Sequence, residues 1–376
     1  MTAVEAAKPW PLGTSSGEKF RLDPALWPAV WDARANTSVF PPTGVKPSIS
    51  HKVPLEVATK AIHTVFGTTP QMGTDPEFFL ARKNEPVGAF EVLKSKAERS
   101  EALPWFWDGF QAEVNAPSYA CHQLIAFYLG KQFQLLPKGL QVVPRTTWRI
   151  PDDMLAYAAE AHVALGCEPS ENAYDMSGIK VENPRELKWR FAGGHLHFSL
   201  EAPETDPMNL RYIVKTLDRF LGVPSVCLAQ NLDHFVRRKY YGLAGEYRKP
   251  KHGLEYRTLS NFWTFHPQST QLILDLARHA CNLGRSHLRR VWIGDDTMVR
   301  NVINYSDVAG AKDLMKLNRE FFDLWAKMAY GTSRPFWEAI NKGVDRVVPN
   351  FGKDIVGVWS KEYANCEEVP MWASLR

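Results

Sequence analysis

Apolar and polar residues alternate with a period of two in several short stretches of the chain, which is the pattern of strands with one buried face. Three such stretches lie between about residues 67 and 115, and each is bounded by Gly, Pro or Asn: GTDPEFFLA, PVGAFEVL and GFQAEVNA. Two more stretches, RFAGGHLHFSLE and GLEYRTLSNFW, follow later in the chain. The pattern predicts that the first three are neighbouring strands of one sheet.

Stretches with helical periodicity and capping residues separate these strands. We predict helices from Ser118 to about Leu136, from Pro151 to Gly166, from Asp206-Pro207 to Gly222, and from Ser269 to Gly284. Outer C-terminal helices are predicted over 312–330 and 335–341. Because strands and helices do not alternate strictly, the sequence predicts an α+β fold with a mostly antiparallel sheet.

The N-terminal segment, residues 1–55, is rich in proline and has little apolar periodicity. We predict that it forms an extended arm, and that a short helix follows from Leu55 to Phe66. Residues 56–376 are predicted to form a single domain with C-terminal helices from about residue 312. The arm is a candidate for contacts between the subunits of a homo-oligomer.

Composition excludes several classes of protein. The 45 Lys and Arg exceed the 41 Asp and Glu by four, too few to indicate a nucleic-acid-binding surface. No run approaches the roughly 18 to 20 apolar residues of a membrane span, and residues 1–13 lack the features of a signal peptide, so we expect a cytoplasmic protein. Five cysteines without a CxxC pair argue against a disulfide framework or a zinc knuckle. The 12% aromatic content favours a large packed core.

Polar residues recur two positions apart in three of the predicted strands, so that each pair lies on one face. The pairs are Asp75 and Glu77, His195 and His197, and Glu255 and Arg257. A further strand contributes Glu113, and Asp108 lies five residues before it. Carboxylates that share one face raise one another's pKa, and a divalent cation relieves this repulsion. Oxygen-rich ligation with one histidine suits Mg²⁺ or Mn²⁺ better than Zn²⁺.

A basic segment lies close to this face in the sequence. Six basic residues accompany one acidic residue, Glu246, and two glycines: Arg237, Arg238, Lys239, Arg248, Lys249 and Lys251. We interpret the segment as a flexible loop that binds the phosphates of a nucleotide. Phosphoryl transfer from ATP is therefore the leading reaction type.

The order of these motifs resembles one family of enzymes. The motifs are DPE, E-V-N-x-P, GCEPSENAY, GGHLHFS, YGLAGEYR and GLEYRTLSNFW, from about Gly73 to Trp263. In this order they resemble the carboxylate-amine ligases of the glutamine synthetase and glutamate-cysteine ligase superfamily, and especially the phage-encoded COOH-NH2 ligases of type 2. The resemblance implies a glutamine-synthetase-like curved, mostly antiparallel sheet with helices on its outer face. It also implies that ATP phosphorylates a carboxylate to an acyl phosphate, from which an amine displaces phosphate to form an amide.

The resemblance further implies roles for individual residues. Five residues match metal ligands: Asp75, Glu77, Glu113, His195 and Glu255. Arg257 matches the arginine that stabilises the transferring phosphoryl group, Glu113 also lies beside the incoming amine, and Arg248 contacts phosphate. Further contacts with ATP are assigned to Arg237, Lys251 and His197. One departure is Pro76, which stands between the two acidic residues of the first strand and cannot donate a ladder hydrogen bond.

Three alternatives remain open at this point. A phosphotransferase of the same fold would stop at a phosphorylated product. A non-haem metal hydrolase or oxygenase would use His195, His197 and a carboxylate as a facial triad. A virion or scaffold protein would keep the fold without catalysis. The expected partners of a ligase are a small-molecule or peptide carboxylate and an amine, with neither nucleic acid nor membrane.

Overall fold

A computed structural model describes residues 70–163, 170–175, 183–232, 235–285 and 292–363. The predicted N-terminal arm and the helix Leu55–Phe66 lie outside these ranges. Within them, no helix has both the length and the apolar character needed to cross a bilayer.

The central feature of the fold is a six-stranded sheet whose paired strands are all antiparallel. Its order is β6 (Ala116–Tyr119), β1 (Met72–Thr74), β11 (Leu196–Ser199), β13 (Gly253–Tyr256), β12 (Glu246–Arg248) and β9 (Glu171–Asn172). Strands far apart in the chain thus become neighbours at β1, β11 and β13. The α+β class and the antiparallel sheet predicted from the sequence are confirmed.

A second antiparallel sheet begins with β2 (Glu77–Arg82), which directly follows β1 of the first sheet in the chain. It contains β3 (Glu85–Val87), β2, β5 (Gln111–Glu113) and β4 (Phe106–Asp108), with β7 (Leu140–Val143) also paired to β2. A separate ladder joins β8 (Thr147–Arg149) to β10 (Trp189–Phe191). The stretch predicted as one strand, GTDPEFFLA, is divided at Pro76 into β1 and β2 because proline has no N–H for the ladder. The stretch PVGAFEVL is also corrected: it forms β3 and then a 3₁₀ turn, Ala89–Glu91.

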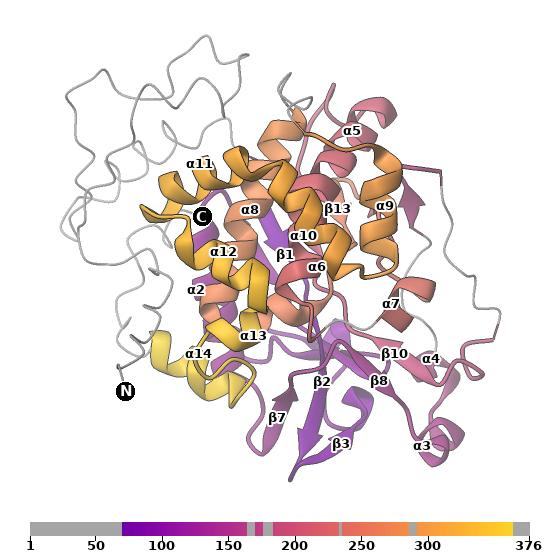
Figure 1. Cartoon of the computed structure of the whole chain (residues 1–376). Coiled ribbons are helices and arrows are strands. Elements are labelled where there is room, and N and C mark those ends of the chain that lie inside the picture. The colour runs from indigo at the N-terminus through magenta and orange to yellow at the C-terminus, as the bar shows by residue number, and fades with distance from the viewer. Residues whose placement is uncertain (1–69, 164–169, 176–182, 233–234, 286–291, 364–376) are drawn as a thin grey trace.

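Helices pack against one face of the six-stranded sheet and form most of the core (Figure 1). The long helices are α2 (His122–Gln134), α5 (Pro207–Leu217) and α8 (Pro267–Arg285), and α5 packs along α8. The remaining ones are α3 (Asp152–Tyr157), α4 (Glu160–Val163), α6 (Val223–Leu228), α7 (Phe235–Tyr240), α9 (Asp296–Asn304), α10 (Val308–Leu317), α11 (Arg319–Tyr330), α12 (Arg334–Lys342), α13 (Val344–Val347) and α14 (Ile355–Tyr363).

One predicted helix boundary is confirmed, and two helix predictions differ from the structure. Asp206 caps α5 by accepting a hydrogen bond from the Met208 N–H at 3.0 Å, with Pro207 in the first turn. Ser118, predicted as the cap of α2, instead belongs to β6, and α2 begins at His122. The helix predicted over 312–330 is interrupted at Asn318, whose side-chain amide donates to the Leu314 carbonyl at 2.9 Å.

Candidate metal and phosphate site

The site begins on the two central strands of the sheet, β11 and β13. Leu196 and Phe198 of β11 are fully buried in the core, so His197 between them points to the opposite face. Glu255 of β13 lies directly across the ladder from His197. The period-two spacing in the sequence therefore places an imidazole and a carboxylate side by side on the face away from the core.

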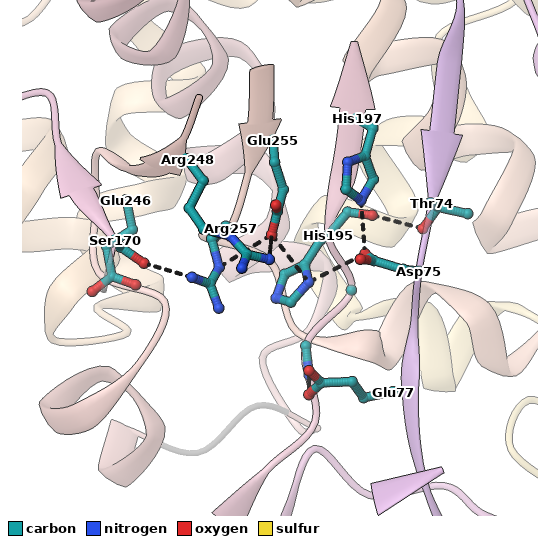
Figure 2. Close-up of polar contacts among 12 residues, drawn as sticks. Thr74, Asp75, Glu77, Ser170, His195, His197, Glu246, Arg248, Glu255 and Arg257 are labelled. Carbon is teal, nitrogen blue, oxygen red and sulfur yellow. Dashed lines mark hydrogen bonds and ion pairs between the residues drawn. The ribbon is translucent and has the colours of Figure 1, made fainter. Parts of the chain in front are cut away.

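Asp75 joins this pair from the end of β1. Its Oδ1 lies 3.2 Å from Nδ1 of His195 and 3.0 Å from Nε2 of His197. One ligand atom each from Asp75, His197 and Glu255 lies within 4.8 Å of the others, which is a spacing that one cation can bridge. Figure 2 shows Asp75 beside both imidazoles, with Glu255 across from them.

The charge state of this triad fits a metal ion. Burial alone would raise the pKa of Asp75, but His197 and His195 outweigh it and hold this pKa well below its usual value. Burial lowers the pKa of His197, but the Asp75 carboxylate outweighs burial and raises it. An ionised carboxylate beside an imidazole that binds a proton is a place where a divalent cation can replace that proton.

A second group of carboxylates lies next to the triad, on β2, β4 and β5. Glu77 and Glu113 are cross-strand partners, and Asp108 lies on the neighbouring strand. Burial, reinforced by the charges of Asp75 and Glu77, raises the pKa of Glu113 to about 9, and burial likewise raises the pKa of Glu77 and Asp108. These groups resist simultaneous ionisation, and a divalent cation would relieve their repulsion.

Two arginines approach the triad at Glu255. Nη2 of Arg248 lies 2.5 Å from Glu255 Oε1, and Nε of Arg257 lies 3.4 Å from the same oxygen. Arg257 is almost completely buried, and its Nη1 donates to Ser170 Oγ at 2.9 Å. Its guanidinium also lies 5.2 Å from the centre of the Tyr241 ring. The two guanidinium groups are thus held next to the candidate metal ligands, as phosphate stabilisation requires.

The other predicted phosphate-binding residues lie elsewhere. Arg237 belongs to α7, is fully buried, and donates to the carbonyl oxygens of Thr258 at 3.0 Å and Leu259 at 2.6 Å. Its guanidinium also lies 5.1 Å from the centre of the Tyr241 ring. The prediction of one flexible basic loop from Arg237 to Lys251 is wrong, because the segment contains α7 and β12. Lys251 is exposed in the turn between β12 and β13.

Several residues around the site were not predicted from the sequence. Tyr241 hydrogen-bonds Nε2 of His195, and the Nδ1 of His197 lies 3.1 Å from Nε2 of His252. A cavity of about 460 Å³ opens beside Asp75 and His197, and it is also lined by Lys96 and Arg99. The only sequence signal for these residues was that Tyr241 lies within the predicted basic segment and His252 directly follows it.

Gly193 and Gly194, which precede His195, pack closely against neighbouring segments of the chain. The Gly193 N–H donates to Glu77 Oε2 at 2.7 Å, and its carbonyl accepts from the Glu77 N–H at 2.9 Å. A Cβ on Gly194 would come within 2.5 Å of the Ser260 carbonyl oxygen. The two glycines allow the chain to approach β2 and the segment after β13 closely, and this packing fixes the position of His195.

One comparison with known proteins finds a family match over part of this site. Residues 187–304 match the family described as "Phage phiEco32-like COOH.NH2 ligase-type 2". Among solved structures, a bifunctional glutathione synthetase from Pasteurella multocida aligns with a TM-score of 0.44 and 10% sequence identity. The alignment covers 85% of this chain and 52% of the synthetase, so the chain spans about half the length of that protein. No curated protein sequence matches the chain.

The matched residues include His195, His197, Glu255 and Arg257, whereas Asp75 and Glu113 lie before the matched segment. Residues 187–304, less than half of the chain, are thus similar to the phage phiEco32-like COOH-NH2 ligase type 2 family.

Proposed function

We propose that the protein is an ATP-dependent carboxylate-amine ligase that forms an amide bond through an acyl phosphate. The observation that carries the proposal is the clustering of Asp75, His197 and Glu255 within 4.8 Å, with Arg248 and Arg257 beside Glu255. Phosphoryl transfer depends mainly on metal ions and guanidinium groups that neutralise the charge of the moving phosphoryl group. The cluster contains two guanidinium groups and three candidate ligands for a metal ion.

In the first step, a carboxylate oxygen of the substrate attacks the γ-phosphorus of ATP, and ADP leaves. We assign Arg248 and Arg257 to the oxygens of the transferring phosphoryl group, because both guanidiniums are held in place by Glu255. Asp75, His197 and Glu255 would hold one Mg²⁺ or Mn²⁺, and His195 would orient Asp75 through the contact at 3.2 Å. A bound Mg²⁺ or Mn²⁺ would polarise the phosphate oxygens.

In the second step, the amine nitrogen attacks the acyl carbon, phosphate leaves, and the nitrogen loses a proton. We assign the second carboxylate cluster, Glu77 and Glu113, to this half of the site. Glu113 in its ionised form would accept the proton that the amine nitrogen loses, and its raised pKa makes that carboxylate a stronger base. Lys96, with Nζ 3.8 Å from Glu113 Oε1, lies at the opening of the same region.

The test is the formation of an amide. The full chain is incubated with ATP, Mg²⁺ and pairs of carboxylates and amines, and ADP release and product mass are recorded. Glu113→Gln and Arg257→Ala should each lower kcat/KM at least about tenfold, which is about 1.4 kcal/mol of barrier. Arg334→Gln is the matched control, because Arg334 is exposed on α12 and should leave the rate unchanged.

The product distinguishes this proposal from its rivals. A mass equal to substrate plus phosphate, with no amide at any amine concentration, would instead establish a phosphotransferase. An activity that needs no ATP would contradict both. If an amide forms but neither Glu113→Gln nor Arg257→Ala slows it, the roles assigned to these residues are wrong while the ligase activity stands.

A further inference from the structure

A second cavity, of about 310 Å³, lies on the helix side of the six-stranded sheet. Its walls come from α5, from α9 and from the residues that follow edge strand β9. α5 and α9 stand together at one side of the molecule in Figure 1. Nine residues line it: Ala173, Tyr174, Asp175, Met208, Arg211, Tyr212, Lys215, Asp296 and Arg300. None of them belongs to the metal and phosphate site.

The floor of this cavity is fixed by hydrogen bonds to the sheet. The Tyr174 N–H donates to Asn172 Oδ1 at 2.8 Å, and the Asn172 amide donates to the Ala244 carbonyl at 2.8 Å. Gly245 leaves room for the Tyr174 ring, since a Cβ there would lie 2.6 Å from Cδ2 of the ring. The Tyr174 ring is therefore held in one place before any ligand arrives.

Positive charge exceeds negative charge around this ring. Nζ of Lys215 lies 4.8 Å from the ring centre, and the guanidinium of Arg300 lies 5.6 Å from it. Asp296 accepts from Lys215 at 2.8 Å and from Arg219 at 2.7 Å, so two cations share a single negative charge. The remaining lining pair, Arg211 and Asp175, is already matched at 2.7 Å.

Arg300 is the cation that this arrangement leaves unbalanced. Among the residues that the structure describes, its hydrogen bond is to the neutral Thr297 hydroxyl at 3.2 Å, and its Nε is buried without a hydrogen-bond partner. A guanidinium with this surrounding favours an anion that can accept two hydrogen bonds. At the rim, Met208 and Tyr212 are 60% and 43% exposed, so apolar surface lies next to the charged group.

We propose that this cavity binds a small organic anion, with a phosphate or carboxylate group at Arg300 and Lys215 and an apolar or aromatic group against Met208 and Tyr212. The site is distinct from the proposed ligase centre. Tyr256 of β13 packs in the core on the cavity's side of the sheet, whereas its neighbour Glu255 points to the other side. The proposal therefore does not depend on the ligase activity.

The test uses the full chain with ¹³C-methyl-labelled methionine and phenyl phosphate as the probe. Titration in the presence of a chelator, which removes divalent cations from the other site, should shift the Met208 methyl signal in a saturable manner. Met208→Leu assigns that signal. Phenol, which has the ring without the anion, should produce no saturable shift.

Arg300→Gln and Lys215→Gln should each raise the Kd for phenyl phosphate about tenfold, since each removes a charge-assisted hydrogen bond. Arg334→Gln removes the same charge from α12 and should leave the Kd unchanged. Unshifted signals of the other methionines show that the variants are folded. The proposal is overturned if the Met208 signal does not respond up to the solubility limit of the probe, if phenol binds equally well, or if neither pocket variant weakens binding.

Discussion

Asp218 is a buried carboxyl group whose ionisation should control how the stability of the protein depends on pH. It is fully buried in the π-helical turn Asp218–Gly222 that follows α5. Its Oδ1 accepts hydrogen bonds from the Tyr256 hydroxyl at 2.7 Å and the Thr258 hydroxyl at 3.4 Å. Burial outweighs these bonds and raises the pKa of Asp218 to about 7.

The sign of the effect follows from which state binds the proton. Between about pH 4 and pH 7 the folded protein keeps the Asp218 proton, whereas the unfolded chain has released it. The contribution of Asp218 to the free energy of unfolding is therefore fully present below about pH 4. It is lost as the pH rises to about 7. At about 1.36 kcal/mol per pKa unit, the full loss is about 4 kcal/mol.

Asp218→Asn should remove this dependence, because the amide is neutral at every pH and its oxygen can still accept from Tyr256. Free energies of unfolding are measured by urea titration with tryptophan fluorescence from about pH 4.5 to pH 7.5. Relative to the wild type, the variant should gain about 3 kcal/mol in free energy of unfolding between pH 4.5 and pH 7.5, because part of the full loss lies below pH 4.5. Asp313→Asn, on the exposed face of α10, should run parallel to the wild type.

The reasoning about Asp218 is refuted if the difference between the Asp218→Asn variant and the wild type is constant over the titration. It is also refuted if the wild type gains stability on the variant as the pH rises. Ionisations elsewhere are common to the two proteins and cancel in the difference, so either result would mean that Asp218 already carries its charge in the folded protein at low pH.

Three further predictions concern the site and its supports. Asp75→Asn should weaken Mn²⁺ binding, followed by the EPR signal of free Mn²⁺, at least about tenfold, whereas Asp313→Asn should not change it; equal affinities would exclude Asp75 as a ligand. Gly194→Ala should lower the free energy of unfolding by about 1 to 3 kcal/mol, because its methyl group would press on the Ser260 carbonyl oxygen, and unchanged urea unfolding would contradict that contact. Arg237→Gln should lower the free energy of unfolding by about 2 kcal/mol or more, because two buried carbonyl oxygens lose their hydrogen bonds to the guanidinium. A loss of ATP affinity without a loss of stability would instead make Arg237 a phosphate ligand.

The residues of the site that could be predicted from the sequence are those fixed by strand periodicity. His197 and Glu255 each stand between two buried apolar residues, so the alternation alone assigns them to the polar face. Which strands become neighbours is decided by long-range pairing, which alternation does not encode. The motif order and its family resemblance supplied that step.

The basic residues could not be assigned in the same way. Arg237 and Arg248 look alike in the sequence, since both lie in a segment of high positive charge. In the fold, the first satisfies buried backbone carbonyls and the second faces Glu255. Charge along the chain does not show whether a guanidinium will contact a carbonyl or a carboxylate. That depends on partners that only the fold brings near, which lie 21 and 22 residues away for Arg237 and 7 residues away for Arg248.

Pro76 separates Asp75 from Glu77, which the alternation alone would place together on one face of one strand. In an unbroken strand, Asp75 and Glu77 would lie on one face at a fixed spacing and belong to one cluster. Pro76 ends β1, so Asp75 stays with the histidines of the six-stranded sheet while Glu77 begins β2 and pairs with Glu113. The proline that seemed to depart from the family pattern therefore divides one acidic motif between two adjacent carboxylate clusters. In the proposed ligase reaction, the cluster of Asp75 would lie beside the phosphate and the cluster of Glu77 and Glu113 beside the incoming amine, so the division at Pro76 would separate the two tasks.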